Sequence, residues 1–428
     1  MKSNINIDSN IGIDIDHITR VEGHGNIHVV IENGKLVEAK WAVVETPRFF
    51  EAMLRGMSHE MAPLLTARIC GICSIGHTLA SLRATERALG IEIPATARKI
   101  RILAKHGETL QSHLLHLFFL VVPDFFYENS LIPFVRSNRT LMEEVLRLRG
   151  LANNICETIA GRTTHPVGFC VGGASKVPHK NKLQKLRKDI ADRFSDLEDV
   201  VKFFKRLEFP DLVRKTEFVS LKGEGNYPWI GGDLISTDGV VKSENDYLAM
   251  TNEYKENFTT SKFTRLSRNS FAVGALARIN NNYRWLKAKE LAEEFVLRPV
   301  NHNPFMNNIA QLVECMHVML ESCDLLDDLL DDSLSDIRAE YEVKGGEGIG
   351  AVEVPRGILY HHYRIDEKGL IEKANCIIPT TQNNANIYYD MAALVEQEIA
   401  RGKSSTEITK LCEMLVRAYD PCISCSVH

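Results

Sequence analysis

Two short stretches decide how this chain must fold: Arg68-Ile69-Cys70-Gly71-Ile72-Cys73-Ser74-Ile75-Gly76-His77 and Asp420-Pro421-Cys422-Ile423-Ser424-Cys425-Ser426-Val427-His428. Each contains a C-x-x-C pair, a spacing that turns both sulfurs to one side so that they can bind one metal. Four thiolates together suit zinc, nickel, copper(I) or an iron–sulfur cluster. The pairs of a zinc ribbon usually lie ~15–20 residues apart, whereas these stand near opposite ends of the chain. A shared site would join both ends through the core, which favours a functional centre over a local clip.

The sequence between the two pairs is mainly helical in pattern. Apolar residues recur at three-and-four spacing, which indicates helices, over residues 46–62, 73–90, 96–122, 137–162, 180–207, 387–419 and a long stretch from about Asn307 to Leu330. Gly25 to Val44 instead alternate apolar and polar residues around Asn33-Gly34. Because Asn-Gly is the preferred pair for a two-residue hairpin turn, we expect two antiparallel strands there.

The remaining segments predict loops and short strands. Residues 209–275 are mixed, and Ala351 to Ile378 have the pattern of another hairpin. The glycines at 345, 346, 348 and 350 predict a loop without the G-x-G-x-x-G spacing of a dinucleotide site. The sequence therefore predicts a mainly α fold with small antiparallel β pieces, an α+β class. We expect one unit over residues 1–428, with a β hairpin region at 16–45, a mainly helical body at 46–428, and metal motifs at 68–77 and 420–428.

The composition excludes several classes of protein. Of 428 residues, 44% are hydrophobic and 25% charged, with 51 basic and 56 acidic side chains. Such a balance indicates an ordinary globular protein and gives no reason to expect nucleic acid or an anionic membrane as a partner. The most apolar stretch, Leu114 to Phe126, contains Pro123 and Asp124 and is shorter than the ~20 residues of a spanning helix. The N-terminus lacks the apolar region of a secretory signal, so we expect a cytoplasmic protein with reduced thiols.

The flanks of the cysteine pairs identify a family. Together the two stretches resemble the motifs RxCGxC…H and DPCxxCxxH of the large subunit of [NiFe] hydrogenases. Arg20-Val21-Glu22-Gly23-His24 is similar to the RxEGH element of that family, and residues 48–51, 355–357 and 379–383 are similar to its other signature stretches. The resemblance runs from Asp16 to His428. It implies the [NiFe] hydrogenase large-subunit fold, which is related to the quinone-site subunit of complex I.

One stretch resembles a particular branch of the family. Ser112-His113-Leu114-Leu115-His116, followed by Pro123-Asp124, is similar to the cytosolic, multi-subunit hydrogenases. Periplasmic members usually have Asp where Ser112 stands, so no carboxylate role is carried over to this position.

The resemblance implies a catalytic centre. In its terms Cys70, Cys73, Cys422 and Cys425 bind nickel, and Cys73 and Cys425 bridge to an iron that carries carbonyl and cyanide ligands. The implied reaction is the reversible heterolytic cleavage of H2 to protons and electrons. Cys422 is the implied base, because the corresponding cysteine of the family is terminal on nickel and polarizable thiolates can take up a proton.

Other residues receive implied roles around this centre. Glu22 is the next proton carrier, although without the motif we would interpret it as a carboxylate paired with Arg20 or His24. Arg356 lies beside the metals and stabilises anionic ligands. Three further residues have implied supporting roles. His77 would orient a bridging thiolate, Thr380 would hydrogen-bond a cyanide, and Asp420 would hold Arg356.

A second ion is implied near the end of the chain. Glu51 stands at the position of the family's Mg²⁺ carboxylate relative to Cys70, His428 supplies an imidazole, and the main-chain carbonyl of Cys376 is the third ligand. Oxygen ligands suit Mg²⁺, while the imidazole leaves Fe²⁺ open. The family is made with a C-terminal extension that is removed after this histidine, so we expect a mature chain.

Partners are implied by what the chain lacks. The six other cysteines, at 156, 170, 315, 323, 376 and 412, show no iron–sulfur spacing and are expected to be buried small apolar residues. Electrons must therefore leave through an iron–sulfur small subunit, with further diaphorase-type or iron–sulfur subunits leading to an acceptor such as NAD(P), a deazaflavin or ferredoxin. Two alternatives remain at this stage. One is a non-catalytic homologue of the complex I quinone-site subunit, which generally lacks the four cysteines, and the other is a structural zinc protein.

Overall fold

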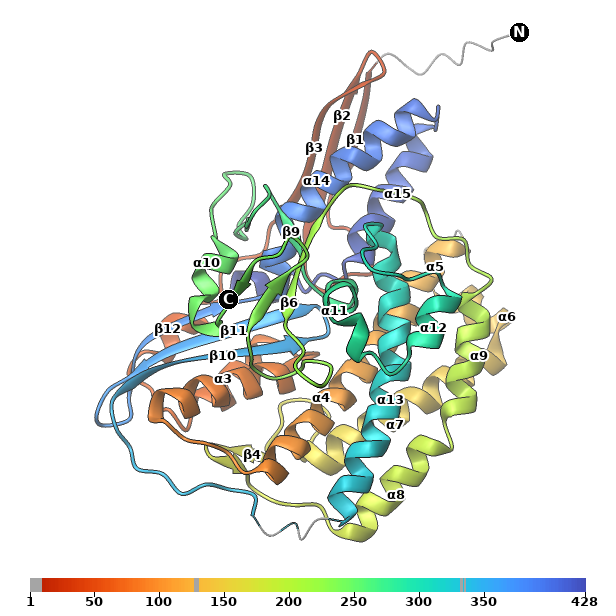
Figure 1. Ribbon diagram of the computed structural model, residues 1–428. Coiled ribbons are helices and arrows are strands. Elements are labelled where there is room, and N and C mark those ends of the chain that lie inside the picture. The colour runs from red at the N-terminus through yellow and green to blue at the C-terminus, as the bar shows by residue number, and fades with distance from the viewer. Residues whose placement is uncertain (1–9, 127–130, 332–333, 335) are drawn as a thin grey trace.

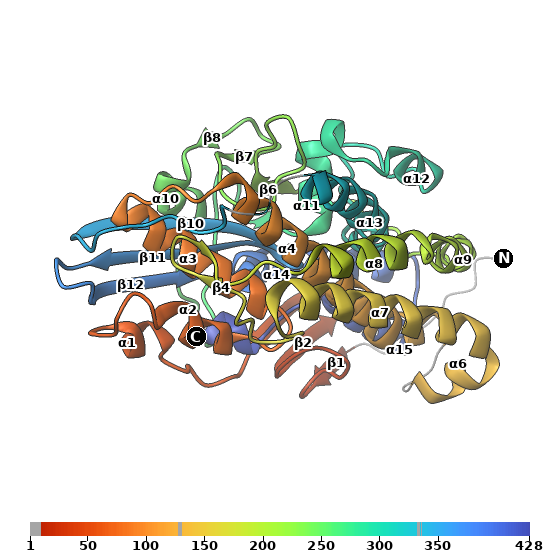
Figure 2. The same ribbon diagram turned by 90° about the horizontal axis from the view of Figure 1, so that it is seen from below.

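The computed structural model describes residues 10–126, 131–331, 334 and 336–428 (Figure 1). Residues 1–9, where we expected no secretory segment, lie outside this part. Long helices form the centre, one three-stranded sheet projects from them, and a second lies against a helix near the cysteine motifs (Figures 1 and 2). Among the described helices, none combines the length and the apolar character needed to cross a bilayer. The mainly helical α+β class predicted from the sequence is confirmed.

The predicted N-terminal hairpin is present as part of a three-stranded antiparallel sheet. Its strands are β1 (Asn10–Ile15), β2 (Gly25–Glu32) and β3 (Lys35–Val43). Asn33 and Gly34 form the turn with φ values of 50° and 72°, the left-handed geometry for which this pair is preferred. The strand β1, which the sequence pattern did not predict, pairs with the free edge of β2. Helix α14 (Pro379–Ala400) packs along β3, and Trp41 Nε1 donates to Asn384 Oδ1 at 3.1 Å.

The long helices in the middle of the chain lie where the sequence predicted them. Its long helices are α3 (Ser74–Leu89), α4 (Ala95–Leu115), α7 (Arg139–Ala160) and α13 (Asn307–Asp331). Helix α4 continues into a π-helical turn, η2 (His116–Val121). Three predicted helices are each divided. Residues 46–62 form only α1 (Phe50–Leu54) and the first residue of α2 (Ala62–Thr66), residues 180–207 form α8 (Lys180–Ala191) and α9 (Phe194–Phe204), and residues 387–419 belong to α14 and α15 (Ser405–Ala418). The first division falls at Gly56, whose φ of 79° is incompatible with a continuing helix.

Short elements connect these helices. They are η1 (Ala67–Ile69), α5 (Val122–Phe125), α6 (Leu131–Ser137), β4 (Phe169–Cys170), β5 (Gly173–Ala174), β6 (Glu217–Leu221), β7 (Leu234–Ser236), β8 (Val241–Lys242), η3 (Glu244–Asp246), α10 (Tyr247–Thr251), β9 (Phe271–Ala272), α11 (Ala275–Asn282), η4 (Tyr283–Trp285), α12 (Lys289–Glu294) and η5 (Pro304–Met306). Strands β6 to β9 form a four-stranded sheet in the order β8-β7-β6-β9. This agrees with the loops and short strands expected over residues 209–275.

The glycine-rich segment was predicted as a loop, and this prediction is wrong. Residues Gly346–Val354 form β10, which pairs with β11 (Gly357–Ile365), and β12 (Ile371–Ile377) completes the sheet. Gly346, Gly348 and Gly350 share one face of the strand, because alternate residues point the same way. A Cβ atom at these three positions would lie 2.0–2.2 Å from the carbonyl oxygens of residues 88, 84 and 80 of α3. The glycines therefore let the strand lie directly on the backbone of α3.

This contact gives a first testable prediction. In the Gly348→Ala variant the new methyl group would meet Ala84 O at 2.2 Å, so the strand and helix must separate. We expect the free energy of unfolding to fall by about 1–3 kcal/mol, the usual cost of overpacking, as measured by denaturant unfolding. Gly150→Ala in α7 is the matched control, because nothing lies within 4 Å of its added Cβ and alanine favours a helix. Equal stability of Gly348→Ala and the parent would contradict the close packing.

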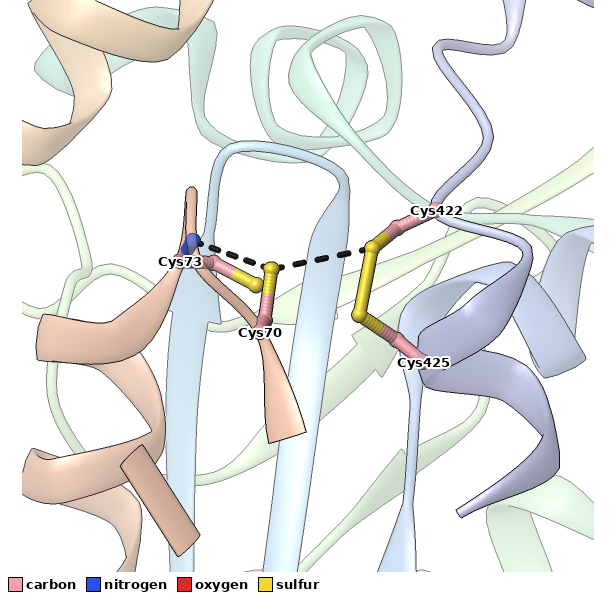
Figure 3. Close-up of side chains that lie close together, drawn as sticks. All are labelled: Cys70, Cys73, Cys422 and Cys425. Atoms are coloured by element: carbon pink, nitrogen blue, oxygen red, sulfur yellow. Dashed lines mark hydrogen bonds between the residues drawn. A yellow bond between two sulfur atoms is a disulfide. The ribbon is translucent and has the colours of Figure 1, made fainter. Parts of the chain in front are cut away.

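The C-terminal segment returns the chain to its N-terminal third. Helix α15 (Ser405–Ala418) follows α14 and begins with a capping box between Ser404 and Glu407. The last turn, η6 (Ser424–Val427), then lies beside the loop that precedes α3 (Figure 3). Both cysteine motifs consequently reach the same part of the core.

Candidate metal centre

The four cysteines of the two motifs meet at one buried place. Cys70 follows η1 and Cys73 directly precedes α3, while Cys422 lies just before η6 and Cys425 lies within it (Figure 3). Their sulfurs all lie within 4.8 Å of one another, and each residue is at most 4% exposed. The Sγ atoms of Cys70 and Cys422, which come from opposite ends of the chain, are 3.6 Å apart. The two pairs thus form one cluster, the arrangement that the sequence predicted.

Within the second pair, Cys422 and Cys425 are joined by a disulfide (Figure 3). This differs from the expectation that all thiols are reduced. Their Cα atoms are 5.5 Å apart, a separation at which the two side chains of a C-x-x-C turn can meet. Cys70 and Cys73 are free thiols. Since metal binding requires thiolates, a metal can use all four sulfurs only when the Cys422–Cys425 bond is reduced.

The first pair of thiols is polarised by its surroundings. Cys70 Sγ accepts hydrogen bonds from the backbone amides of Ile72 and Cys73 at 3.3 and 3.2 Å. The side-chain hydrogen bond with Cys73 lowers the pKa of Cys70 despite burial, and Arg356 lowers it further. The same hydrogen bond, together with burial, raises the pKa of Cys73 well above its usual value. A thiolate, the form that binds metals, therefore forms first at Cys70.

Arg356 lies near this pair and is held by Asp420. Its Nε donates to Asp420 O at 2.6 Å and its Nη2 to Asp420 Oδ1 at 2.8 Å. Burial would lower the pKa of the guanidinium, but Asp420 and the thiols of Cys73 and Cys70 raise it overall, so the charge is retained. Arg356 Nη1 is buried and has no hydrogen-bond partner among the described residues. Because such a donor costs about 1–3 kcal/mol when left unpaired, the site suits an anionic group here.

Hydrogen bonds also fix the backbone of the turn that carries Arg356 and the backbone at Cys422. Arg278 donates from Nη1 to Val354 O at 2.9 Å and from Nη2 to Pro355 O at 3.2 Å, which fixes the turn that carries Arg356. Thr380 Oγ1 accepts from the Cys422 amide at 2.9 Å. The Thr380 hydroxyl proton remains available to donate to a group bound at the cluster.

Glu22 lies against the second cysteine motif. Its backbone pairs with that of Cys422, its carbonyl accepts from Ile423 N at 2.9 Å, and its carboxylate accepts from Ser424 N at 3.1 Å and from the Ser424 hydroxyl. A Cβ at Gly23 would lie 2.8 Å from Ile423 Cβ, so glycine permits this close approach.

The alternative partners considered for Glu22 are engaged elsewhere. Arg20 pairs with Asp124, and His24 Nδ1 lies 2.7 Å from Glu45 Oε1. The interpretation of Glu22 as a carboxylate paired with Arg20 or His24 is therefore wrong.

His77 faces a second histidine. Its Nδ1 lies 3.1 Å from His361 Nε2, and His361 Nδ1 lies 2.7 Å from the hydroxyl of Tyr363. Burial lowers the pKa of both imidazoles, that of His361 to about 3, so both rings are neutral. His77 Nε2 is buried and makes no hydrogen bond to any described residue. This nitrogen could therefore form a hydrogen bond with a group bound at the cysteine cluster.

The second group of candidate ligands also comes together. Potential ligand atoms of Glu51, Cys376 and His428 lie within 4.8 Å of one another. His428 Nε2 is 2.6 Å from Cys376 O and 3.6 Å from Glu51 Oε1, which accepts from Cys376 N at 2.7 Å. Burial would raise the pKa of Glu51, but its hydrogen bonds to His428 and Cys376 lower it overall. Burial and Glu51 hold the pKa of the Cys376 thiol well above its usual value, which favours its carbonyl as the ligand.

Sequence reasoning missed the residues that hold the two motifs together. Arg48 Nη2 donates to Ile69 O at 2.8 Å and to Ser424 O at 2.6 Å, and so bridges the two cysteine loops. Glu108 Oε1 accepts from Gly76 N at 3.0 Å in the first turn of α3 and is paired with the fully buried Lys105. Neither Glu108 nor Lys105 stands in a motif. Arg48 belongs to the signature stretch 48–51, but that resemblance assigned it no role.

A buried cluster of four cysteine sulfurs beside a fixed arginine defines a metalloprotein with a soft-ligand centre. Comparisons with known proteins make this more specific. The sequence profile described as nickel-dependent hydrogenase matches residues 48–131 and 226–428, and a HoxL-like profile matches residues 12–46. The chain belongs to the nickel-dependent hydrogenase family. It is the catalytic subunit of a [NiFe] hydrogenase, an oxidoreductase that acts on H2.

Curated relatives match over nearly the whole chain. Sulfhydrogenase 2 subunit alpha of Pyrococcus furiosus is 34% identical, over 97% of this chain and 98% of its own. The NAD-reducing hydrogenase HoxS subunit beta of Cupriavidus necator is 29% identical, over 97% of this chain and 94% of its own. A solved NAD+-reducing [NiFe]-hydrogenase in the H2-reduced state has a TM-score of 0.88 at 28% identity, over 99% of this chain and 100% of that one. The two alternatives, a complex I homologue and a structural zinc protein, are not favoured.

Proposed function

We propose that Cys70, Cys73, Cys422 and Cys425 hold the nickel of a nickel–iron pair, with Cys73 and Cys425 also binding the iron, which carries carbonyl and cyanide ligands. The observation that carries this proposal is the approach of four buried sulfurs to within 4.8 Å of one another. Polarizable thiolates suit nickel, and the unpaired Arg356 Nη1 suits an anionic ligand. When bound, the metal pair would supply the Lewis acidity that splits H2.

The residues around the cluster would manage the proton. The Cys422 thiolate is the proposed base, since its amide is fixed by Thr380 and its backbone by Glu22. Glu22 is the next carrier, because a carboxyl group within one hydrogen bond or one water of the base can relay a proton. Arg356, held by Asp420, would stabilise negative charge near the metals. His77 and Thr380 would each offer one hydrogen-bonding atom to the centre.

Metal analysis and infrared spectroscopy of the purified complex test this function. We expect nickel and iron in equal amounts, metal-bound carbonyl and cyanide stretches, and dye reduction that depends on H2. Zinc in place of nickel, together with a spectrum without these stretches, would overturn the assignment.

We also propose a Mg²⁺ or Fe²⁺ ion bound by Glu51, His428 and the carbonyl of Cys376. The hydrogen bonds among these groups support it, because two oxygen atoms and one imidazole nitrogen already converge. A cation here would tie the last turn to β12 and α1, and so support the turn that carries Cys422 and Cys425.

The Glu51→Gln variant tests this ion. A neutral amide is a much weaker ligand for a hard cation, so we expect the ion to be lost and hydrogen exchange over residues 422–428 to become faster. Element analysis and hydrogen-exchange mass spectrometry are the measurements. Glu60→Gln is the control, because the Glu60 carboxylate accepts from the Tyr341 hydroxyl at 3.1 Å and is not among the three proposed ligands. A metal-loaded structure without an ion at these three residues would contradict the proposal.

We infer that the electrons leave through an iron–sulfur small subunit. Exposed apolar side chains of Phe49, Met53, Met61 and Leu64 lie on and beside α1 and α2, and the chain runs from α2 through η1 to Cys70. Such a patch supports a partner seated next to the centre, with an interface of the obligate class of upwards of about 2,000 Å². Further diaphorase-type or iron–sulfur subunits, a soluble acceptor such as NAD(P) or ferredoxin, and a cytoplasmic location belong to the same proposal.

A further inference from the structure

Arg48 contacts the chain directly before two of the proposed nickel ligands. Its Nη2 donates to Ile69 O at 2.8 Å and to Ser424 O at 2.6 Å. Ile69 is followed by Cys70, and Ser424 is followed by Cys425. The Ile69 carbonyl oxygen also lies 3.8 Å from Cys425 Sγ. One guanidinium nitrogen therefore joins the two cysteine loops at the edge of the sulfur cluster.

The guanidinium of Arg48 forms no ion pair with a carboxylate of the described residues. Its two acidic neighbours in the chain are used elsewhere, because Glu45 is hydrogen-bonded to His24 and Glu51 to the Cys376 amide. Arg48 Nε is buried and makes no hydrogen bond within the described part of the chain. The positive charge of Arg48 is thus balanced only by two main-chain carbonyl dipoles.

Glu22 is the acid that shares a contact residue with Arg48. Its carboxylate accepts from the amide and the hydroxyl of Ser424, whereas Arg48 donates to the carbonyl of the same residue. The carboxylate and the guanidinium therefore bind different groups of Ser424. A substitution at Arg48 leaves both hydrogen bonds of Glu22 intact.

The charge of Arg48 matters because the cysteine cluster becomes negative when it is loaded. Metal binding requires deprotonated sulfurs, and four of them meet here. Arg356, the other arginine of the site, is already paired with Asp420 at 2.8 Å. Since charges interact more strongly in a partly buried site than in water, the unpaired guanidinium of Arg48 would stabilise the thiolates.

The main chain and a ring hold Arg48 in place independently of its two side-chain hydrogen bonds. Its backbone amide donates to Val427 O at 2.9 Å. The guanidinium carbon lies 5.3 Å from the centre of the ring of Phe50, a distance at which a cation and a ring attract. A substitution of the side chain would therefore remove the charge and the link between the loops, while the contact to Val427 remains.

We propose that Arg48 is a positioning residue that holds the two cysteine loops together and supplies an uncompensated positive charge to the loaded centre. The inference rests on the proposed binding of nickel and iron by the four cysteines. Without the side chain, the two loops would lose the hydrogen bonds that join them. Without the charge, the more reduced and more negative states of the centre would be disfavoured.

Hydrogen exchange of the purified complex tests the positioning role. In Arg48→Met we expect faster exchange over residues 69–73 and 422–426, because neither loop is held to the other by this side chain. The ion at Glu51 and His428 should remain, which distinguishes this variant from Glu51→Gln. Exchange at the parent rate in both segments would overturn the positioning role, whatever the activity of the variant.

A comparison of two variants tests the charge. Arg48→Lys keeps a cation, whereas Arg48→Met does not. We expect Arg48→Met to shift the midpoint potential of the centre to lower values and to slow H2 oxidation by about 10- to 100-fold, the usual effect of losing a group that supports a metal ligand. Arg48→Lys should keep a potential close to that of the parent. An equal shift in both variants, no shift in either, or loss of nickel and iron from both would overturn the role of the charge.

Arg101→Met is the matched control for a loss of stability alone. The Nη2 of Arg101 also donates to two main-chain carbonyls, Cys170 O at 3.1 Å and Gly173 O at 2.9 Å. Arg101 is buried and paired with Glu86, and it contacts neither cysteine motif. We expect a less stable protein with an unchanged midpoint potential. A potential shift equal to that of Arg48→Met would show a general effect and overturn the inference.

The outcomes separate this inference from the proposed function. A parent complex without nickel, iron or H2 oxidation would overturn the proposed function. Hydrogen exchange of the parent and of Arg48→Met would still decide whether Arg48 holds the two loops together. A parent with both metals, together with an Arg48→Met variant of unchanged exchange and potential, would instead overturn only the role of Arg48.

Discussion

Replacement of Cys73 or Cys425 by serine is expected to abolish incorporation of the nickel–iron pair. A serine hydroxyl is a hard, neutral ligand at any working pH, whereas the soft metals of this centre are bound by thiolates. The four sulfurs lie within 4.8 Å of one another in a buried site, so no other side chain can enter to replace a lost ligand. We expect nickel and iron to fall to background in element analysis and the infrared bands of the metal ligands to disappear.

The control for this experiment is a cysteine outside the cluster. Cys412 is fully buried in α15, and burial raises the pKa of its thiol to about 12, so it behaves as a small apolar residue. Cys412→Ser should cost about 1–3 kcal/mol of stability by burying a hydroxyl, yet it should retain both metals. A full complement of nickel and iron in Cys73→Ser or Cys425→Ser would remove the basis for the assignment of the bridging thiolates.

The parts of the fold that the sequence predicted are those encoded by local patterns. The hairpin turn at Asn33-Gly34 needs only two residues with positive φ, and the long helices need only apolar residues at helical spacing. The glycine-rich strand β10 could not be predicted this way, since glycine normally weakens a strand. Its glycines are required by the backbone of α3, more than 250 residues earlier in the numbering, and such a contact leaves no local pattern.

The candidate site shows the same division. The C-x-x-C spacing indicates paired thiols wherever it occurs, and the flanking residues connected both pairs to one family. The interactions of Arg48 and Glu108 were not predictable, because each depends on which backbone carbonyl or amide the fold places opposite the side chain. A single arginine or glutamate carries no spacing signal of its own, so only the three-dimensional structure could show that they support the centre.

Glu22 is expected to be the second residue whose loss stops the reaction while the metals stay in place. Splitting of H2 in a buried site leaves a proton where an isolated charge is costly, so a titratable group must be within one hydrogen bond or one water of the base. The backbone of Glu22 pairs with that of Cys422, and its carboxylate contacts the amide of Ser424 at 3.1 Å. No other carboxylate of the described residues is hydrogen-bonded to the segment from Cys422 to Cys425.

The Glu22→Gln variant separates proton transfer from structure. The amide oxygen can still accept from Ser424, so nickel, iron and the infrared bands should be unchanged. Because an amide cannot exchange a proton as an acid, we expect H2 oxidation and the exchange of H2 with deuterated solvent to slow by about 10²–10⁴-fold. Glu22→Asp should be affected less, since a water can span the shortened reach. Glu45→Gln is the matched control, because the carboxylate of Glu45 is hydrogen-bonded to His24 and not to the second cysteine motif. If Glu22→Gln exchanges deuterium at the parent rate, the proton leaves by another route and Glu22 only holds Ser424 in place.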